Sequence, residues 1–284
     1  MKFRVAVAQM EIAQLSPDIN LDKAESLIQK AVSQECHIIT FPEDFVTGPI
    51  GGNKDYVDFE SKYVRYFQEL AKKYGIDIAA GSIIEGDAEG WYNTAYYIDS
   101  SGAILGKYRK VHLWDPEVAY LQPGGSVCVF DTKYGKASLS ICFDIVFPEL
   151  FRIMEMQNVE IIFCPSYWTE WHELGVLKYN QMPTSEFINS LAVARSIENC
   201  AVFVYTNAAG TVSFGNEKET LVGHSQVAVP FIGSHAKLQH NREELLVCDI
   251  DTNLLNEARQ AYKLRDGLKQ DAHLRLKRVL DSTF

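Results

Sequence analysis

Residues 137–149 read Ala-Ser-Leu-Ser-Ile-Cys-Phe-Asp-Ile-Val-Phe-Pro-Glu, and this stretch predicts a strand followed directly by a helix. The apolar positions of Ala137–Ile141 favour the strand, and Phe147-Pro148-Glu149 marks the start of the helix. Cys142 would stand in the tight turn between them, close to the N–H groups of the helix start. Such groups lower a cysteine pKa and increase the reactive thiolate. Taken alone, Cys142 is read more simply as a buried structural cysteine.

Strand-like and helix-like segments alternate through the rest of the chain. The expected strands are Phe3–Gln9, His37–Phe41, Ile76–Ile84, Tyr92–Asp99, Val127–Asp131, Ile161–Cys164, Ala201–Thr206, Gly223–Val229 and Leu245–Ile250; the expected helices are Asn20–Gln34, Tyr56–Tyr74, Pro148–Met156 and Thr184–Asn199. A short turn separates Ile76–Ile84 from Tyr92–Asp99, so these strands are expected to be antiparallel neighbours. The order predicts a mixed α/β fold.

Nothing in the sequence marks a domain boundary. The 284 residues contain no low-complexity linker, no fixed repeat and no abrupt change of composition, so we predict one domain spanning 1–284. The stretch Arg259–Arg278 is basic, but Asp266 and Asp271 interrupt it, and it lacks the density of a nucleic-acid-binding arm. We expect the segment 252–284 to be an extension that docks on the core or on a partner subunit.

The balance of charges is acidic. The 27 Lys and Arg and 37 Asp and Glu residues give a formal net charge of −10, which repels nucleic-acid phosphate and anionic membrane surfaces. We therefore expect a small-molecule partner, with no nucleic acid and no membrane. Residues Met1–Gln9 alternate like a strand and lack the features of a signal peptide, and no apolar run approaches the roughly 18 residues that span a bilayer. These features predict a soluble, cytoplasmic protein.

Several templates for cofactor, metal or serine chemistry fail. The six cysteines show no Cys-x-x-Cys pair, and the seven histidines show no metal spacing. Gly102–Tyr108 superficially resembles a phosphate loop, but it is one residue short between its glycines and has Tyr108 in place of Ser or Thr. Gly223–Val227 lacks the final glycine of a serine nucleophile elbow. We predict reduced thiols, no cofactor and no metal.

Two charged residues follow strand-like segments, where α/β proteins commonly place functional groups. Glu43 comes after His37–Phe41, and Lys110 lies just after an outer strand, within Gly106–Leu113. Each has a plainer interpretation: Glu43 as a solvated loop residue or helix cap, and Lys110 as part of a surface charge cluster. Neither residue alone predicts catalysis.

Taken together, three segments resemble the signatures of the nitrilase (carbon-nitrogen hydrolase) superfamily. In chain order they are Pro42-Glu43, Lys110-Val111-His112-Leu113 and Cys142-Phe143-Asp144-Ile145-Val146-Phe147-Pro148-Glu149. Supporting similarities run over nearly the whole chain, at Val5–Gln9, Tyr92–Ala95, Ala194–Asn199 and Gly223–Ser225. The conjunction is far more specific than any one segment.

This resemblance implies a four-layer α-β-β-α sandwich, with two protomers paired through their helices into an eight-layer homodimer or a higher homo-oligomer. It implies that Cys142 is the nucleophile, Glu43 the general base and Lys110 the cation that stabilises the tetrahedral intermediate. The backbone N–H of Phe143 would complete the oxyanion hole. Glu117 matches a second glutamate that positions the lysine or the substrate.

The resemblance also limits the range of reactions that we expect. Phe143-Asp144 after the cysteine is similar to the amidase and carbamoylase branches, so we expect an amidohydrolase that cleaves a linear amide or N-carbamoyl compound through a thioester. Val146 stands where many of those branches carry arginine, which removes a cation beside the site. The runners-up are nitrile hydrolysis, acyl transfer to an amine by the same triad, and a catalytically silent binding protein.

Three further residues are expected to bind substrate: Asn93, Tyr167 and Trp168. The last two belong to the ring-rich stretch Tyr167–His172, which in similar proteins lines the pocket. The same rings could equally form a packing plug or a subunit contact.

Overall fold

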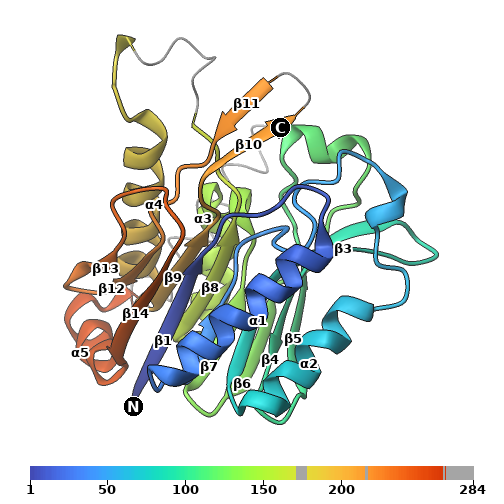
Figure 1. Cartoon of the computed structure of the whole chain (residues 1–284). Helices are drawn as coiled ribbons and strands as arrows, with labels where there is room; N and C mark the ends of the chain where they lie inside the picture. The colour runs from blue at the N-terminus through green and yellow to red at the C-terminus, as the bar shows by residue number, and fades with distance from the viewer. Residues whose placement is uncertain (171–177, 215–216, 265, 267–284) are drawn as a thin grey trace.

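The computed structural model describes residues 1–170, 178–214, 217–264 and 266 (Figure 1). The expected aromatic positions 171 and 172 and the part of the expected 252–284 extension beyond residue 266 lie outside this range. None of the described helices is long and apolar enough to cross a membrane.

The first of two six-stranded sheets contains the N-terminal strands. Its order is β14 (Glu244–Asp251), β1 (Lys2–Gln9), β2 (Ile38–Thr40), β3 (Asp77–Gly86), β4 (Trp91–Ile98) and β5 (Ile104–Arg109). The strands β1, β2 and β3 are parallel, and the outer strands pair antiparallel, including β3 with β4 as predicted. The stretch Val5–Ala8 of β1 is wholly apolar because successive side chains enter two different cores: Val5 and Val7 one, Ala6 and Ala8 the other.

The second sheet repeats this plan. Its order is β13 (Gly233–Lys237), β12 (Gln226–Val229), β9 (Val202–Asn207), β8 (Ile161–Ser166), β7 (Gly135–Leu139) and β6 (Cys128–Thr132), with β7, β8 and β9 parallel. A separate two-stranded ribbon consists of β10 (Thr211–Phe214) and β11 (Glu217–Thr220).

Helices cover the outer face of each sheet. The helices α1 (Pro17–Ser33) and α2 (Lys62–Tyr74) share one core with the first sheet, whereas α3 (Pro148–Met156) and α4 (Pro183–Asn199) pack on the second. Figure 1 shows α1 and α2 together on one outer face of the molecule. The two sheets lie face to face, with β1 against β9 and β3 against β8. The predicted four-layer α-β-β-α sandwich is therefore confirmed.

The predicted start of the second helix at Tyr56 is wrong. Lys54–Tyr56 form a short 3-10 helix, η1, and α2 begins only at Lys62. The carboxylate of Asp58 determines this boundary, because it accepts hydrogen bonds from the backbone N–H groups of Lys62 and Tyr63, both at 3.0 Å. A side chain that satisfies these N–H groups ends the helix on its N-terminal side.

The last helix within the described residues lies in the expected C-terminal extension. The helix α5 (Asn253–Tyr262) buries Leu255 and Ala258 completely, and Leu255 belongs to the main core. The described part of this segment thus packs on the protein's own core.

Candidate active site

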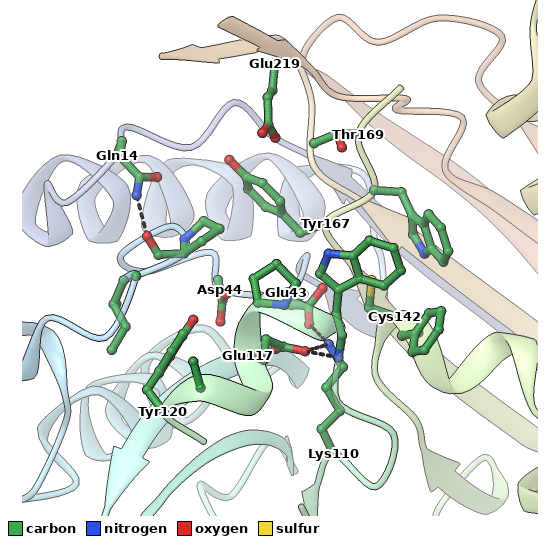
Figure 2. Close-up of a pocket in the computed structure, with 18 of the residues that line it drawn as sticks. Gln14, Glu43, Asp44, Lys110, Glu117, Tyr120, Cys142, Tyr167, Thr169 and Glu219 are labelled. Atoms are coloured by element: carbon green, nitrogen blue, oxygen red, sulfur yellow. Dashed lines mark hydrogen bonds and ion pairs between the residues drawn. The ribbon is translucent and has the colours of Figure 1, made fainter. Parts of the chain in front are cut away.

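Side chains from both sheets meet at the carboxyl ends of the parallel strands. Glu43 follows β2, Lys110 follows the edge strand β5, Cys142 follows β7, and Glu117 lies in the 3-10 helix η2 (Asp115–Ala119). All four line one cavity of about 740 Å³ (Figure 2). The four residues are almost entirely withdrawn from solvent, with exposed fractions of 1–8%. The structure therefore brings together the four residues predicted to be catalytic.

A close approach between two backbone segments positions Glu43. The chain turns after Phe41 and passes over Gly81, where a Cβ atom would lie only 2.0 Å from the Pro42 carbonyl oxygen. Gly81 also has a φ of 47°, a conformation that glycine adopts without strain. The backbone N–H of Glu43 then donates to the Ser166 carbonyl of the second sheet, at 3.3 Å. Glu43 is thus held at the junction of the two sheets.

Lys110 lies between two carboxylates. Its Nζ is 2.7 Å from Oε1 of Glu43 and 2.6 Å from Oε2 of Glu117. Asn93 donates to both carboxylates from Nδ2, at 2.9 Å and 3.0 Å, and Glu117 also accepts from the Trp114 backbone N–H at 2.7 Å. These contacts fix the ammonium and both glutamates relative to one another.

Cys142 has a strained backbone at the turn after β7. Its φ is 45°, in the left-handed region, which costs a non-glycine residue about 1–2 kcal/mol. The 3-10 helix η3 (Cys142–Val146) follows directly and leads into α3. The predicted strand-to-helix turn is therefore present, and it directs the thiol into the cavity towards Glu43 (Figure 2).

The fully buried carboxylate of Asp144 supports this turn. Its Oδ2 accepts from the Tyr108 hydroxyl at 2.7 Å and from the Ile141 backbone N–H at 2.9 Å. Its Oδ1 lies 2.9 Å from the His112 backbone nitrogen and 2.8 Å from His112 Nδ1. The His112 ring stacks on Phe147 with centroids 3.8 Å apart. Asp144 thus joins the cysteine turn to the segment that carries Lys110.

Burial and mutual charge set the protonation of the three central groups. Burial raises the pKa of Glu43, while Lys110 opposes and Glu117 adds to the shift. Burial also raises the pKa of the Cys142 thiol well above its usual range, and the negative charge of Glu43 acts in the same direction. Burial lowers the pKa of Lys110, but Glu43 and Glu117 outweigh it and raise that pKa. The resting cysteine is therefore a protonated thiol beside a carboxylate that can take its proton.

The residues predicted to form the oxyanion hole and bind substrate do not all lie in the same place. Phe143, Tyr167 and Trp168 line the cavity, and the Phe143 and Trp168 ring centroids lie 6.3 Å apart. Asn93 is fully buried behind the two glutamates and is not among the lining residues. Val146 lies outside the lining as well, and the guanidinium of Arg195 donates to its carbonyl oxygen at 3.3 Å.

The cavity wall contains residues that sequence reasoning did not select. The most notable are Gln14, Asp44, Trp114, Tyr120 and Glu219. Asp44 directly follows Glu43, so its position in the chain was an available signal. The other four come from loops and from β11, and no local pattern marks them.

No metal site is evident in the part of the chain that the structure describes. There, no three His, Cys, Asp or Glu side chains gather in an arrangement that could hold a metal ion. All six cysteines lie within that part and are free thiols.

The chain is similar in sequence and in fold to known carbon-nitrogen hydrolases. The family model described as carbon-nitrogen hydrolase matches residues 4–260. The 2-oxoglutaramate amidase of Bacillus subtilis is 29% identical over 278 residues, which cover 96% of this chain and 100% of that enzyme. The omega-amidase of Mus musculus is 31% identical over 283 residues, with 95% and 96% covered. The fold is similar to the crystal structure of a carbon-nitrogen hydrolase from Helicobacter pylori G27, with a TM-score of 0.87, 22% identity and coverage of 97% and 98%.

Proposed function

Because this chain belongs to the carbon-nitrogen hydrolase family and is an amidohydrolase, we propose that it cleaves a linear primary amide through a thioester on Cys142. Glu43 acts as general base, and Lys110 stabilises the tetrahedral intermediate. The relatives named as a 2-oxoglutaramate amidase and an omega-amidase favour an amide over an N-carbamoyl substrate. One observation carries the assignment: Lys110 is buried against Glu43, and Glu43 in turn contacts the protonated Cys142 thiol.

In the first half of the reaction, Glu43 takes the thiol proton while the sulfur attacks the amide carbon. The carbonyl oxygen becomes an oxyanion, and its charge is stabilised by the Lys110 ammonium and the backbone N–H of Phe143. When the intermediate collapses, the carbon–nitrogen bond breaks. Glu43 returns its proton to the departing nitrogen, so ammonia leaves and a thioester remains on Cys142.

In the second half, Glu43 takes a proton from a water molecule that attacks the thioester carbon. The same two donors stabilise the second oxyanion. Breakage of the carbon–sulfur bond releases the carboxylic acid, and the proton on Glu43 returns to the Cys142 sulfur. A carboxylate with a raised pKa suits both halves, because it must accept and return a proton near neutral pH.

Glu117 and Asn93 position these catalytic groups. Glu117 holds the Lys110 ammonium at 2.6 Å, and Asn93 bonds both glutamates, so each positions the catalytic groups. We assign Asn93 this positioning role in place of substrate contact, because it is fully buried and absent from the cavity wall.

We further propose that the protein works as a cytoplasmic homodimer. Ile153 and Met156 of α3 expose 47% and 63% of their surface, and Met182, just before α4, exposes 49%. Apolar side chains exposed on the outer helices of the second sheet suit a second copy of the same face. The single-domain organisation over 1–284 and the docking of the C-terminal extension stand as part of this proposal.

The experiment that tests the proposed function is intact-protein mass spectrometry after mixing with primary amides, combined with an assay of released ammonia. Wild type is expected to gain the mass of the acyl group and to release ammonia. Cys142→Ser is expected to lose turnover by at least a hundredfold and to show no thioester. Cys128→Ser, at a half-buried thiol in β6, is the matched control and should behave as wild type. Acylation of Cys142→Ser at a position other than 142, located by peptide mapping, would refute the assignment.

A further inference from the structure

The cavity beyond the catalytic groups is acidic. Asp44 and Glu219 line it in addition to Glu43 and Glu117. Lys110 is the one basic side chain among the described residues that form the wall, and two carboxylates already hold its ammonium. The gaps at 171–177 and 215–216, which adjoin wall segments in the chain, contain no lysine or arginine in the sequence. The described wall therefore offers an anionic substrate group no free cation.

Asp44 contributes a buried carboxyl group with unused hydrogen-bonding capacity. Burial and the negative charges of Glu43 and Glu117 raise its pKa well above the usual range, so an ammonium bound beside it would favour the ionised form. It is only 6% exposed, and its Oδ1 has no hydrogen-bond partner. Its backbone N–H is occupied, since it donates to the Ser82 hydroxyl at 3.1 Å. Buried carboxylate oxygens are normally paired, so an unpaired one that lines a cavity indicates a donor supplied from outside.

The position of Asp44 suits the far end of a substrate. Figure 2 shows Asp44 beside the Tyr120 side chain, with Glu43 between Asp44 and Cys142, and with Tyr167 and Glu219 above them. An acyl chain that starts at the Cys142 sulfur would point its remote end towards these groups. The Tyr167 hydroxyl has no partner either and offers a neutral polar contact there.

Aromatic rings complete this part of the wall. Trp114, Tyr120 and Tyr167 all line the cavity. The faces of such rings attract cations, and carboxylates nearby add to the attraction. A carboxylate in the same place would meet two acidic side chains and no free basic side chain of the described wall.

We propose that the substrate is an amide whose acyl chain carries a positively charged amine at the end remote from the amide, and that Asp44 and Glu219 bind this amine. The inference rests on the proposed amide hydrolysis at Cys142 and names its substrate class. Asp44 provides a buried partner for the ammonium, and Glu219 on β11 provides a second one at an exposed position of the wall.

Three primary amides of equal chain length test the proposal: 5-aminopentanamide, pentanamide and 4-carbamoylbutanoate. They differ at the remote end, which is cationic, neutral or anionic. We expect kcat/KM for ammonia release to be at least tenfold higher for 5-aminopentanamide than for pentanamide, and lowest for 4-carbamoylbutanoate. A pentanamide or 4-carbamoylbutanoate value equal to or above that of 5-aminopentanamide would overturn the inference.

Variants of Asp44 and Glu219 test whether these two residues cause the preference for the amine. In Asp44→Asn and Glu219→Gln the ratio of kcat/KM for 5-aminopentanamide to that for pentanamide should fall by about tenfold. Glu89→Gln removes an exposed carboxylate in the turn between β3 and β4, outside the cavity, and should keep the wild-type ratio. An unchanged ratio in both cavity variants would also overturn the inference.

Failure of this inference is distinguishable from failure of the proposed function. If pentanamide acylates Cys142 and no preference for the amine is seen, the amidase assignment stands and the substrate class is wrong. If none of the three amides acylates Cys142 or releases ammonia, both are wrong.

Discussion

The Nζ of Lys110 lies 2.7 Å from Oε1 of Glu43, and neither residue is more than 3% exposed. Removing the ammonium would leave two buried carboxylates, Glu43 and Glu117, without their counter-charge. We expect Lys110→Met to lower kcat by about 10²–10³-fold and to destabilise the fold by about 3–5 kcal/mol.

Urea unfolding and steady-state kinetics measure these two effects. Lys107→Met is the matched control, because Lys107 lies on β5, the strand that leads to Lys110, and its side chain is 45% exposed. That control should lose only about 1 kcal/mol, because Lys107 is half-exposed and Arg109 also faces its buried partner Glu85, at 3.7 Å. A Lys110→Met protein with wild-type kcat would remove Lys110 from the mechanism.

The raised pKa of Glu43 predicts the acid limb of the pH profile. Glu43 must be ionised to act as a base, so kcat/KM should fall as the pH drops through its folded-state pKa. Burial raises that pKa, and the limb should therefore lie above the ordinary glutamate value of about 4.3. Because the buried groups interact, the midpoint belongs to the coupled set.

The variant Glu117→Gln gives this pH prediction a sharper test. The negative charge of Glu117 contributes to the raised pKa of Glu43, so its removal should move the acid limb to lower pH. The profile of kcat/KM between about pH 4 and pH 9 is the measurement. A limb that moves to higher pH in this variant would show that another group titrates.

Because Asp144 supports the Cys142 turn, we expect its substitution to impair catalysis although Asp144 does not line the cavity. In Asp144→Asn an amide NH2 replaces one oxygen and faces N–H or O–H donors, so two hydrogen bonds are lost. We expect a loss of about 3 kcal/mol of stability and a fall in kcat larger than the change in KM, since the Cys142 turn moves.

Tyr108→Phe is a milder change to the same hydrogen-bond network and is compared with Asp144→Asn. It removes one donor to the carboxylate and leaves the others, so it should cost about 1–2 kcal/mol and affect kcat less. Equal effects of the two variants, measured by urea unfolding and by kcat, would contradict a network centred on Asp144.

The exposed apolar positions of α3 predict the mode of assembly. Light scattering at micromolar concentration should give twice the chain mass of 32.1 kDa. Ile153→Asp should give monomers, because it places a charge in the proposed contact. Ile104→Asp on β5 changes an apolar residue of similar exposure, 41%, and should stay dimeric. A monomeric wild type would refute the paired-sandwich proposal.

Much of the framework could be predicted from the sequence. Apolar runs such as Phe3–Gln9 and Ile161–Cys164 indicate strands because each is buried on both faces. The three signature segments indicate Glu43, Lys110 and Cys142 because each directly follows a strand, where few residues separate the motif from the element that positions it.

Other elements carry no such signal. The strand β11 is short and wholly polar, and β13 is only partly buried, so neither shows the alternation that predicts a strand. The strand β10 alternates polar and apolar residues, but over only four positions. The helix α5 lies in a charged stretch and fully buries only Leu255 and Ala258. Gln14 and Tyr120 reach the cavity through the tertiary arrangement of loops, which no local pattern encodes.

The division of the site between two sheets has a consequence for how the protein refolds. Glu43 and Lys110 belong to the first sheet and are 67 positions apart, whereas Cys142 belongs to the second. Such contacts are distant in sequence, and forming them is slow compared with forming local helices. Recovery of activity after dilution from denaturant would therefore report the docking of one sheet on the other. The rate at which turnover recovers would therefore measure how fast the two sheets dock during refolding.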